Sequence, residues 1–572
     1  MARFRNRFGD RARFGFLAVD ILDQLDPEQR AAAEALVGPV VILAGAGTGK
    51  TRTITHRIAH GVAKGYYSAN RVLALTYTNR AAGELRQRLR QLGIPGVSVK
   101  TFHAAALAQL EFFWPQFAGV PAPSVIDSKA KLINQVAQEA KITLDAAAVR
   151  EFAAEIEWRK YSMLSLEQYA EAKRPLVAGL SAQRNLELQR AYESAKVTAQ
   201  RLDWEDVLVL TIGLLRAEPR ALAHVQQQYR FFTVDEYQDI SPLQHALLDL
   251  WLGERSDLCV VGDPNQTIYS FTGASSRFLH SFSERFPNST TVQLTRNYRS
   301  TGSIVNLANR LVSDLSQIDP LTAQGAFGDA PTIASRESVS IEASTTAESI
   351  AELIAQGTPA REIAVLYRVN GQSEPFENEL SKLGIGYQVK GGDRFFNRRD
   401  VQAAVRGVRA EAVAHPDSHP FEVMTNVIRV LGWQAQPPQE AGTQRETWEA
   451  LNSLLEIAGE MPEASKAADL VHELEERQRS QHEPVVDAVT LSTIHAAKGL
   501  EWDVVFVAGL TEGYLPIGFA KTEAEIAEER RLLYVAITRA RRLLRLSWPR
   551  RDEAAGRNRE PSRFIADLSP RT

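Results

Sequence analysis

A glycine-rich run that ends in lysine and threonine is the first stretch of this sequence with residues suited to chemistry. It follows the apolar run Val40 to Leu43 and precedes a segment with helical periodicity. In such a unit the glycines let backbone N–H groups face phosphate oxygens, the lysine reaches the β and γ phosphates, and the threonine hydroxyl binds Mg²⁺. The alternative is a tight turn without a ligand, but the lysine–threonine ending favours an ATP site. The candidate residues are Ala44, in place of the usual first glycine, Gly45, Ala46, Gly47, Thr48, Gly49, Lys50, Thr51 and Arg52.

Two adjacent carboxylates end a second apolar run, Phe231 to Val234. Asp235 is suited to hold Mg²⁺ together with Thr51, and Glu236 is suited to polarise an attacking water. Such a pair alone is more often a solvated strand end, but the phosphate loop makes nucleotide hydrolysis the better interpretation. The number of residues between Lys50 and Asp235 is larger than one compact nucleotide-binding core would contain, which is roughly 100 to 150 residues. A helical insertion between them accounts for the excess and favours a motor ATPase.

The elements that must position these residues alternate between strands and helices. This alternation predicts parallel α/β layers. Two stretches rich in Ala, Glu, Gln and Leu interrupt it, at about 110 to 228 and about 400 to 485, and we interpret them as helical subdomains inserted into the α/β cores. Pro437 and Pro438 predict a turn inside the second. The predicted strands are Val40–Leu43, Val72–Tyr77, Phe231–Val234, Leu258–Val261, Ile363–Tyr367 and Val504–Val507.

Composition excludes several classes of protein. Of 572 residues, 44% are hydrophobic and 24% charged, which is typical of a globular enzyme. The net charge of −3 means that a nucleic-acid surface must be a local patch. The single Cys259 excludes an internal disulfide or a cysteine-cluster metal site, and no apolar run is long enough to span a membrane. Residues 1–20 are a basic tail with arginines at 3, 5, 7, 11 and 13, either a solvated tail or a phosphate-binding arm.

Further motifs follow in order along nearly the whole chain. Asp235-Glu-Tyr-Gln-Asp239 resembles the carboxylate motif of the UvrD, Rep and PcrA superfamily 1 helicases. The set is most similar to UvrD-like helicases of actinobacteria. The other motifs are Leu25-Asp-Pro-Glu-Gln29, Thr76-Tyr-Thr-Asn-Arg80, Thr101-Phe-His103, Val261-Gly-Asp-Pro-Asn-Gln266, Asn297-Tyr-Arg299, Leu366-Tyr-Arg-Val-Asn370, Thr493-Ile-His-Ala-Ala-Lys-Gly-Leu-Glu501 and Glu528 to Ala540.

The resemblance assigns roles around the nucleotide. It places Gln29 at the adenine edge, although Asp26 and Gln29 also form a capping box that needs no nucleotide. It makes Arg299 and Arg539 arginine fingers from the second core, Arg539 lying on the apolar face of a predicted helix over 523–540. The remaining roles are base stacking for Tyr298, γ-phosphate sensing for Gln266 and ribose binding for Glu501.

The resemblance also predicts a surface for single-stranded DNA. Bases stack on aromatic rings regardless of sequence, because every base has a π face. Each of these aromatic residues taken alone is more often part of a hydrophobic core, but their positions beside the nucleotide motifs favour the strand. The stacking residues are Tyr77, Tyr269 and Phe271, and the other strand contacts are Thr78, Asn79, His103 and His495.

The expected fold is α/β, with two RecA-like P-loop cores whose parallel sheets each carry a mainly helical insert. The first core takes 21–110 and 229–290, with its insert at 111–228. The second core takes 291–400 and 486–572, with a short insert at 401–485 and no C-terminal accessory domain.

The expected activity is an ATP- and Mg²⁺-dependent 3′-to-5′ DNA helicase. It would act in the bacterial cytoplasm, associated with the nucleoid, as a monomer or with weak self-association. Its partners would be single-stranded DNA, junctions of single- and double-stranded DNA, and possible repair or replication proteins. Three alternatives stay open: a translocase that displaces proteins but unwinds poorly, a nucleic-acid-binding protein with a vestigial ATP site, and a small-molecule phosphotransferase.

Four departures from the family pattern accompany this expectation. The run Phe271 to Ala274 lacks the arginine common in the family. The stretch between Trp548 and Pro561 lacks the aromatic residue that many relatives place there, so no strand-separating pin is expected. The second insert is shorter than in the longer relatives, and residue 572 leaves no room for a nuclease or an added nucleic-acid module.

Overall fold

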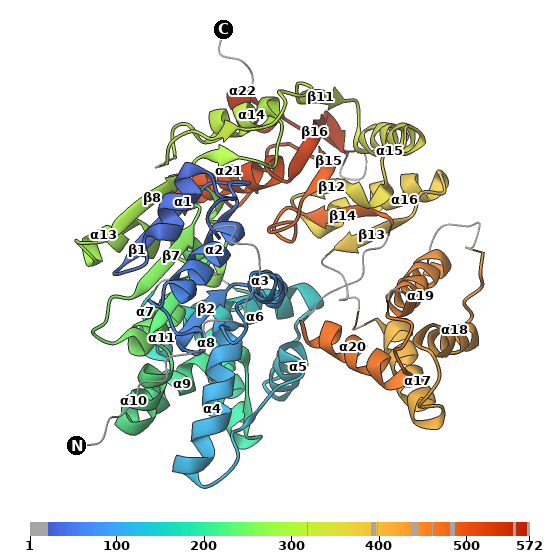
Figure 1. Cartoon of the computed structure of the whole chain (residues 1–572). Coiled ribbons are helices and arrows are strands. Elements are labelled where there is room, and N and C mark those ends of the chain that lie inside the picture. Colours follow the sequence, from blue (N-terminus) through green and yellow to red (C-terminus); the bar gives the residue numbers. More distant parts are fainter. Residues whose placement is uncertain are drawn as a thin grey trace, which may run out of the picture.

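The computed structural model in Figure 1 describes residues 21–172, 174, 177–316, 318–390, 396, 398–436, 443–459, 461–480, 487–552 and 556–568. The basic tail of residues 1–20 and the turn predicted at Pro437 and Pro438 lie outside these ranges. Within them, no helix has both the length and the apolar character needed to cross a bilayer.

The first sheet contains six parallel strands in the order β3-β2-β6-β7-β1-β8. Side chains alternate between its two faces, and both faces are covered, which explains why whole strands are apolar. Val41, Leu73 and Phe232 pack on one face, whereas Val40 and Ile42 pack on the other. The strands are β1 (Val40–Ala44), β2 (Val72–Thr76), β3 (Ser98–Thr101), β6 (Phe231–Val234), β7 (Leu258–Gly262) and β8 (Thr290–Leu294).

Helices from distant parts of the chain cover the two faces of this sheet. The face of Val40 packs against α1 (Pro27–Glu34), α2 (Lys50–Ala63) and α3 (Asn79–Gln91). The opposite face packs against α4 (Phe102–Ala118), α9 (Trp204–Ala217), α10 (Pro219–Gln228) and α11 (Pro242–Leu252).

The second sheet repeats this architecture with six parallel strands in the order β11-β16-β15-β12-β14-β13. Its faces are covered by α14 (Gly302–Val312) and α21 (Glu523–Ile537) on one side and by α15 (Val339–Ala355) and α16 (Glu374–Lys382) on the other. The strands are β11 (Thr332–Arg336), β12 (Ile363–Tyr367), β13 (Tyr387–Lys390), β14 (Val489–Thr493), β15 (Trp502–Val507) and β16 (Ala540–Pro549). The predicted parallel α/β cores are thus confirmed.

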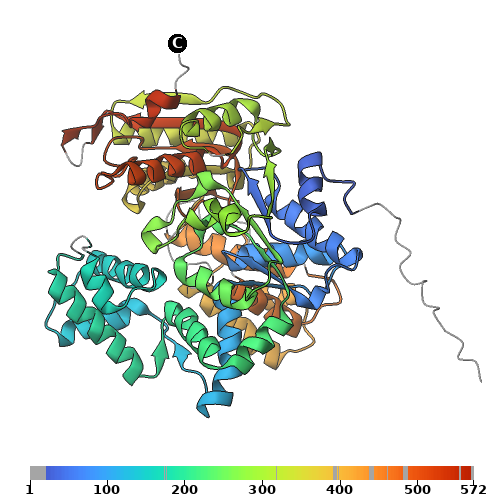
Figure 2. The same ribbon diagram turned by 90° about the vertical axis from the view of Figure 1, so that its left-hand side faces the viewer.

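Each core carries helices with a hydrophobic core of their own. The first group, α5 (Lys129–Glu139), α6 (Ala146–Tyr161), α7 (Leu166–Glu171) and α8 (Ala182–Thr198), forms a separate lobe at the lower left of Figure 2. The second group, α17 (Arg399–Ala414), α18 (Pro420–Val430), α19 (Thr443–Gly459) and α20 (Ala467–Ser480), lies apart from both sheets at the right of Figure 1.

Three predicted boundaries need correction. The boundary between 290 and 291 cuts through β8, which pairs with β1 from Val40 to Ala44 and so extends the first core to Leu294. Helices α9 and α10 fall inside the predicted insert of 111–228, but their buried residues belong to the hydrophobic cluster of the first sheet. The helix predicted over 523–540 ends at Ile537, because the chain then turns into β16 at Ala540.

Candidate active site

The glycine-rich loop lies between the end of β1 and the start of α2, as predicted. Gly47 and Gly49 have φ angles of +70° and +79°, a left-handed conformation that favours glycine. A Cβ on Gly47 would lie 2.6 Å from Asn297 Nδ2 and 2.7 Å from Arg299 Cβ. A side chain at Gly47 would therefore clash with residues of the second core, which lie directly against the loop.

Hydrogen bonds to two backbone carbonyls of this loop join it to the second core. Asn297 Nδ2 donates to the carbonyl of Ala46 at 2.8 Å, and Tyr298 N donates to the carbonyl of Gly47 at 2.9 Å. Ala46 is also part of a hydrophobic cluster formed mostly by the second core. A group bound to the loop would thus contact both cores.

Asp235 and Glu236 follow β6 beside the loop. Lys50 Nζ lies 3.9 Å from Glu236 Oε1, and Glu236 has a φ of +52°, an unusual conformation for a residue other than glycine. Burial opposes ionisation of Glu236, but Lys50 and Lys498 outweigh it and lower its pKa. Burial and the Glu236 charge raise the pKa of Asp235. Glu236 is therefore ionised more readily than Asp235.

The Asp235 environment fits a divalent cation. Its partly buried carboxylate accepts a hydrogen bond from Glu236 N at 2.9 Å, and a cation would offset the desolvation that raises its pKa. No group of three or more His, Cys, Asp or Glu residues suited to a metal occurs among the described residues. Thr51, Asp235, phosphate oxygens and waters would therefore have to supply the ligands, which is the usual way that Mg²⁺ binds in nucleotide sites.

A chain of buried polar contacts links Glu236 to the second core. Gln238 donates to Glu236 and accepts from Asp263 N at 3.1 Å, and Asp263 accepts from Gln266 Nε2 at 2.7 Å. Arg539 Nη2 reaches Gln266 Oε1 at 3.4 Å. The sequence did not indicate a role for Asp263, but its fully buried carboxylate orients Gln266.

The two predicted arginine fingers lie side by side near this chain. Arg539 is almost fully buried and donates to the carbonyls of Leu500 and Val535 at 3.0 Å. Burial and the neighbouring Arg299 charge lower the pKa of Arg539 to about 9. Arg299 Nη2 forms an ion pair with Glu501 Oε2 at 2.5 Å. The oxygens of Val535, Leu500 and Gln266 thus accept hydrogen bonds from the Arg539 guanidinium.

The predicted adenine and ribose residues are only partly brought together. Gln29 and Asp26 form the expected capping box, and Gln29 Nε2 also donates to the carbonyl of Thr48 at 3.0 Å. Tyr298 is half exposed and its hydroxyl donates to Asp26 Oδ2 at 2.7 Å. Glu501 pairs with Arg299 instead. Arg52, which follows the loop, donates to the carbonyl of Gln24, a residue shortly before the capping box of Asp26 and Gln29.

Four of the predicted strand residues form one cluster of rings where the cores meet. Tyr77 and Tyr269 stack with ring centroids 5.4 Å apart and planes 14° apart. Phe271 lies 6.1 Å from Tyr269, and His495 of the second core lies 5.6 Å from Phe271. Tyr77 and Phe271 are 40% and 53% exposed, so these two rings have faces open to solvent.

The other predicted strand residues lie on the first core. Thr78 caps α3 through its side chain, with Asn79 as the first residue of that helix. His103 lies against the first insert, where its Nε2 is 3.2 Å from the Tyr161 hydroxyl and its ring meets Trp204 edge-on at 6.0 Å. Burial, with a smaller contribution from Lys129, lowers the pKa of His103 to about 4.

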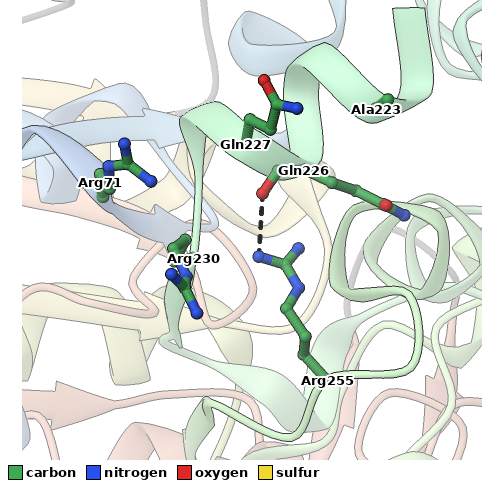
Figure 3. Close-up of a pocket in the computed structure, with 6 residues that line it drawn as sticks. All are labelled: Arg71, Ala223, Gln226, Gln227, Arg230 and Arg255. Carbon is green, nitrogen blue, oxygen red and sulfur yellow. Dashed lines mark hydrogen bonds between the residues drawn. The ribbon is translucent and has the colours of Figure 1, made fainter. Parts of the chain in front are cut away.

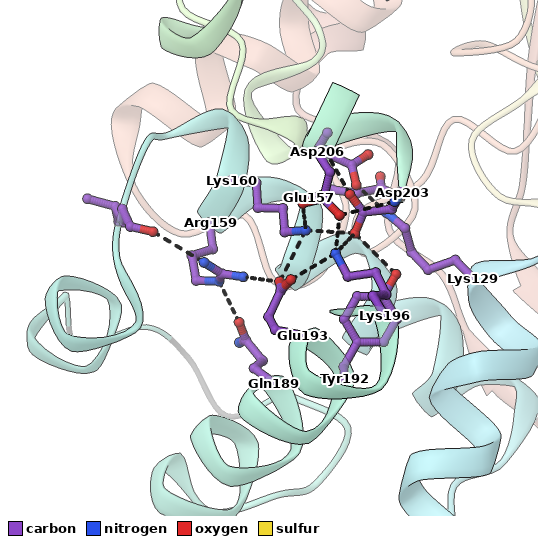
Figure 4. A network of polar contacts seen from close by, with 12 residues as sticks. Lys129, Glu157, Arg159, Lys160, Gln189, Tyr192, Glu193, Lys196, Asp203 and Asp206 are labelled. Carbon is purple, nitrogen blue, oxygen red and sulfur yellow. Dashed lines mark hydrogen bonds and ion pairs between the residues drawn. The ribbon is translucent and has the colours of Figure 1, made fainter. Parts of the chain in front are cut away.

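A buried ion network anchors the insert next to His103 (Figure 4). Lys160 Nζ and Lys196 Nζ each lie 2.7 Å from Asp203 Oδ2, and Asp203 caps the helix that begins with Trp204. Lys129 contacts Glu205 at 2.7 Å on the other side of Trp204. The network thereby fixes the start of α9 while the Trp204 ring stays 48% exposed.

Residues 25–287 match the UvrD/REP helicase N-terminal domain, and residues 292–412 and 421–551 match the UvrD-like helicase C-terminal domain. The chain belongs to the UvrD/Rep helicase family. It is therefore a helicase enzyme, and the sequence-based identification of the family is confirmed.

Several bacterial relatives are similar over nearly the whole chain. The ATP-dependent DNA helicase UvrD2 of Mycobacterium tuberculosis is 44% identical over 96% of this chain and 82% of its own length. The ATP-dependent DNA helicase PcrA of Leuconostoc citreum is 30% identical over 96% and 85% of the two chains. The ATP-dependent DNA helicase Rep of Escherichia coli is 28% identical over 95% and 94%.

Besides Asp263, sequence reasoning missed three residues of this helicase site. Lys498 forms a buried ion pair with Asp239 at 2.5 Å and donates to the carbonyl of Gln266 at 2.6 Å, which joins the two cores directly. Lys498 and Asp239 both lie inside motifs quoted from the sequence, and their opposite charges were the feature that could have indicated an ion pair. Trp204 was missed as well, although an aromatic residue between two acids at a helix start is unusual for a buried core.

Proposed function

We propose that this helicase uses ATP and Mg²⁺ to move along single-stranded DNA in the 3′-to-5′ direction and to open duplexes at junctions. The observation that carries the proposal is the joint site, where the glycine loop and Glu236 of one core face Arg299 and Arg539 of the other. We further propose that its substrate is bacterial DNA, because the similar proteins UvrD2, PcrA and Rep are DNA helicases of bacteria. We propose DNA repair or replication restart as its process.

The proposed hydrolysis depends on contacts from both cores. Lys50 would bind the β and γ phosphates, Glu236 would orient the attacking water, and Gln266 would contact the γ phosphate. Mg²⁺ held by Thr51 and Asp235 would neutralise charge on the phosphates. Arg299 and Arg539 would stabilise the charge of the transition state, which requires Arg299 to leave Glu501.

Nucleotide binding would thereby change the contacts between the ring cluster and the DNA strand. Gln266 is followed within five residues by Tyr269 and Phe271, so a shift of the γ-phosphate contact reaches the ring cluster through one short segment. Lys498 connects the same segment to the second core, with its ammonium 5.1 Å from the Tyr269 ring. Alternating closure and opening of the cores would then move the strand past the rings.

The tail of the chain bears on duplex opening. β17 (Arg551–Asp552) and β18 (Arg557–Asn558) form an antiparallel hairpin after β16, in the region where an aromatic pin was considered absent. The paired positions of this hairpin carry two arginines, an aspartate and an asparagine. We therefore keep the weakly unwinding translocase as a second candidate.

A comparison of tailed duplexes tests the proposed polarity and unwinding. The protein is given ATP and a short duplex with either a 3′ or a 5′ single-stranded tail, and strand separation is followed on a gel. We expect separation only with the 3′ tail. Separation from the 5′ tail alone would overturn the polarity, and translocation without separation would favour the second candidate.

A further inference from the structure

A pocket lined by three arginines lies at the edge of the first sheet that faces away from the glycine loop (Figure 3). Arg71 precedes β2, Arg230 precedes β6, and Arg255 lies before β7, so all three lie where parallel strands begin. The predicted strand residue Tyr77 follows the other end of β2. Five residues of strand separate the two ends by roughly 17 Å, so the pocket is distinct from the ring cluster.

The backbone places two of these arginines at neighbouring positions. Val72 pairs with Phe231 in the parallel register, and Arg230 N donates to the carbonyl of Arg71 at 2.9 Å. Arg71 and Arg230 are therefore neighbours across two strands, an arrangement of like charges that destabilises a sheet. Within the described part of the chain, neither side chain has a hydrogen-bond or ion-pair partner.

The third arginine is fixed and adds to the positive charge. Arg255 Nη1 donates to the carbonyls of Gln226 and Tyr229 at 3.0 and 2.8 Å, at the end of α10. Burial lowers the pKa of Arg255, and the Arg230 charge lowers it further. This pocket thus concentrates positive charge in a molecule whose net charge is −3, and an anion would relieve the repulsion.

The shape and surroundings of the pocket favour a compact anion over a nucleic-acid backbone. Its volume is about 320 Å³, and Ala223, Gln226 and Gln227 of α10 form the rest of its lining. Glu254 and Asp257 flank Arg255 in the sequence and would repel a long row of phosphates. A single carboxylate at Arg71 and Arg230 would meet less of this repulsion than a row of phosphates.

An exposed apolar surface borders the same helix. Phe112 and Phe117 of α4 and Val120, just after this helix, are 55%, 41% and 54% exposed. The Phe112 ring lies 5.9 Å from the ring of His224, which follows the pocket residue Ala223 on α10. Basic and apolar surfaces therefore adjoin on one helix.

We propose that this pocket binds a short acidic segment of a partner protein, with a carboxylate between Arg71 and Arg230 and an apolar side chain on the Phe112 surface. Planar guanidinium groups bind carboxylates with two parallel hydrogen bonds, and exposed apolar patches mark interaction sites. The site would recruit the helicase to a partner without touching the ATP site.

Fluorescence anisotropy tests this proposal directly. The probe is a short labelled peptide with several aspartates and one phenylalanine, and a matched peptide carries asparagine in place of aspartate. We expect the acidic peptide to bind and the Arg71→Glu/Arg230→Glu variant to weaken binding at least tenfold. The matched control is Arg150→Glu/Arg184→Glu, which makes the same charge change at exposed arginines of α6 and α8 and should bind as the natural chain does.

Each other outcome overturns the proposal. Equal weakening in both double variants would indicate a general charge effect, and equal binding of both peptides would exclude carboxylate recognition. Loss of binding to a short DNA duplex, with peptide binding unchanged, would assign the pocket to nucleic acid. DNA-stimulated ATP hydrolysis of each variant shows separately that the motor is folded and active.

Discussion

At the scale of single residues, Lys50 has the most direct part in the proposed chemistry. Its ammonium lies 3.9 Å from Glu236, so a phosphate in the loop would compete with this carboxylate for the same cation. The predicted strand residues lie on other segments. Phosphate binding and strand binding therefore depend on different side chains.

Lys50→Ala should reduce ATP hydrolysis at least ~100-fold, because it removes a charge that stabilises the phosphates in the transition state. Binding of single-stranded DNA should change less than ~3-fold, since no ring of the cluster contacts Lys50. Steady-state hydrolysis and anisotropy with labelled DNA measure the two effects. Loss of both together would show that the site is wrongly assigned.

The histidines of the strand surface should not respond to pH in the physiological range. Burial lowers the pKa of His495 to about 3, with help from Arg368 and Lys498, and that of His103 to about 4. A histidine with a lowered pKa stays neutral until the pH falls to that value. The slope of log affinity against log salt should thus be equal at pH 6 and pH 8, whereas a steeper slope at pH 6 would mean that a histidine binds phosphate as a cation.

At the scale of elements, the glycine loop works only if the second core can approach it. Gly47 has a positive φ, and Asn297 and Arg299 occupy the space that its Cβ would need. Gly38 has a similar φ of +79° but nothing within 4 Å. Alanine substitutions at the two glycines therefore distinguish the effect of backbone strain from the effect of a methyl group placed between the cores.

Gly47→Ala should lower the rate of DNA-stimulated hydrolysis more than tenfold, because the methyl group keeps Arg299 from the loop. Gly38→Ala should cost only about 1 kcal/mol of stability from its backbone strain and leave the rate nearly unchanged. Kinetics and thermal unfolding of both variants provide the test. Equal rates would mean that the cores need not close on the loop.

The ion network of the first insert also positions whole elements, because it joins α6, α8 and the start of α9. Lys196 is 2% exposed and pairs with Asp203 and Glu193 at 2.7 and 2.8 Å. Lys196→Met would remove one of the two lysines that neutralise the buried Asp203 carboxylate and leave Lys160 as the other, at a cost below the ~3 to 5 kcal/mol of a buried charge left with no partner. Hydrogen exchange should therefore accelerate in α6, α8 and α9 but not in the second sheet.

Lys131→Met, at an exposed lysine of α5, is the control for this change. It should leave exchange in those three helices as it is in the natural chain. If Lys196→Met also left exchange unaltered, the network would not anchor the start of α9, and Trp204 would owe its position to other contacts.

At the scale of the whole molecule, the sequence predicted the two parallel sheets because their strands are buried on both faces and read as short apolar runs. It also predicted a nucleotide loop whose glycine conformations match the requirement. It could not assign α9 and α10 to the first sheet, because an amphipathic helix does not specify which surface it covers. Contacts such as Lys498–Asp239 and Arg299–Glu501 join distant segments, and local patterns carry no information about such partners.

Because the proposed ATP site takes residues from both cores, we expect ATP hydrolysis to depend on DNA that brings the cores together. ATP hydrolysis should be measured without nucleic acid, with single-stranded DNA and with single-stranded RNA at equal nucleotide concentration, using Glu236→Gln as the control. We predict strong stimulation by DNA that is lost in Glu236→Gln. Hydrolysis that is equal with and without nucleic acid, or absent throughout, would contradict a motor and favour a phosphotransferase or a vestigial ATP site.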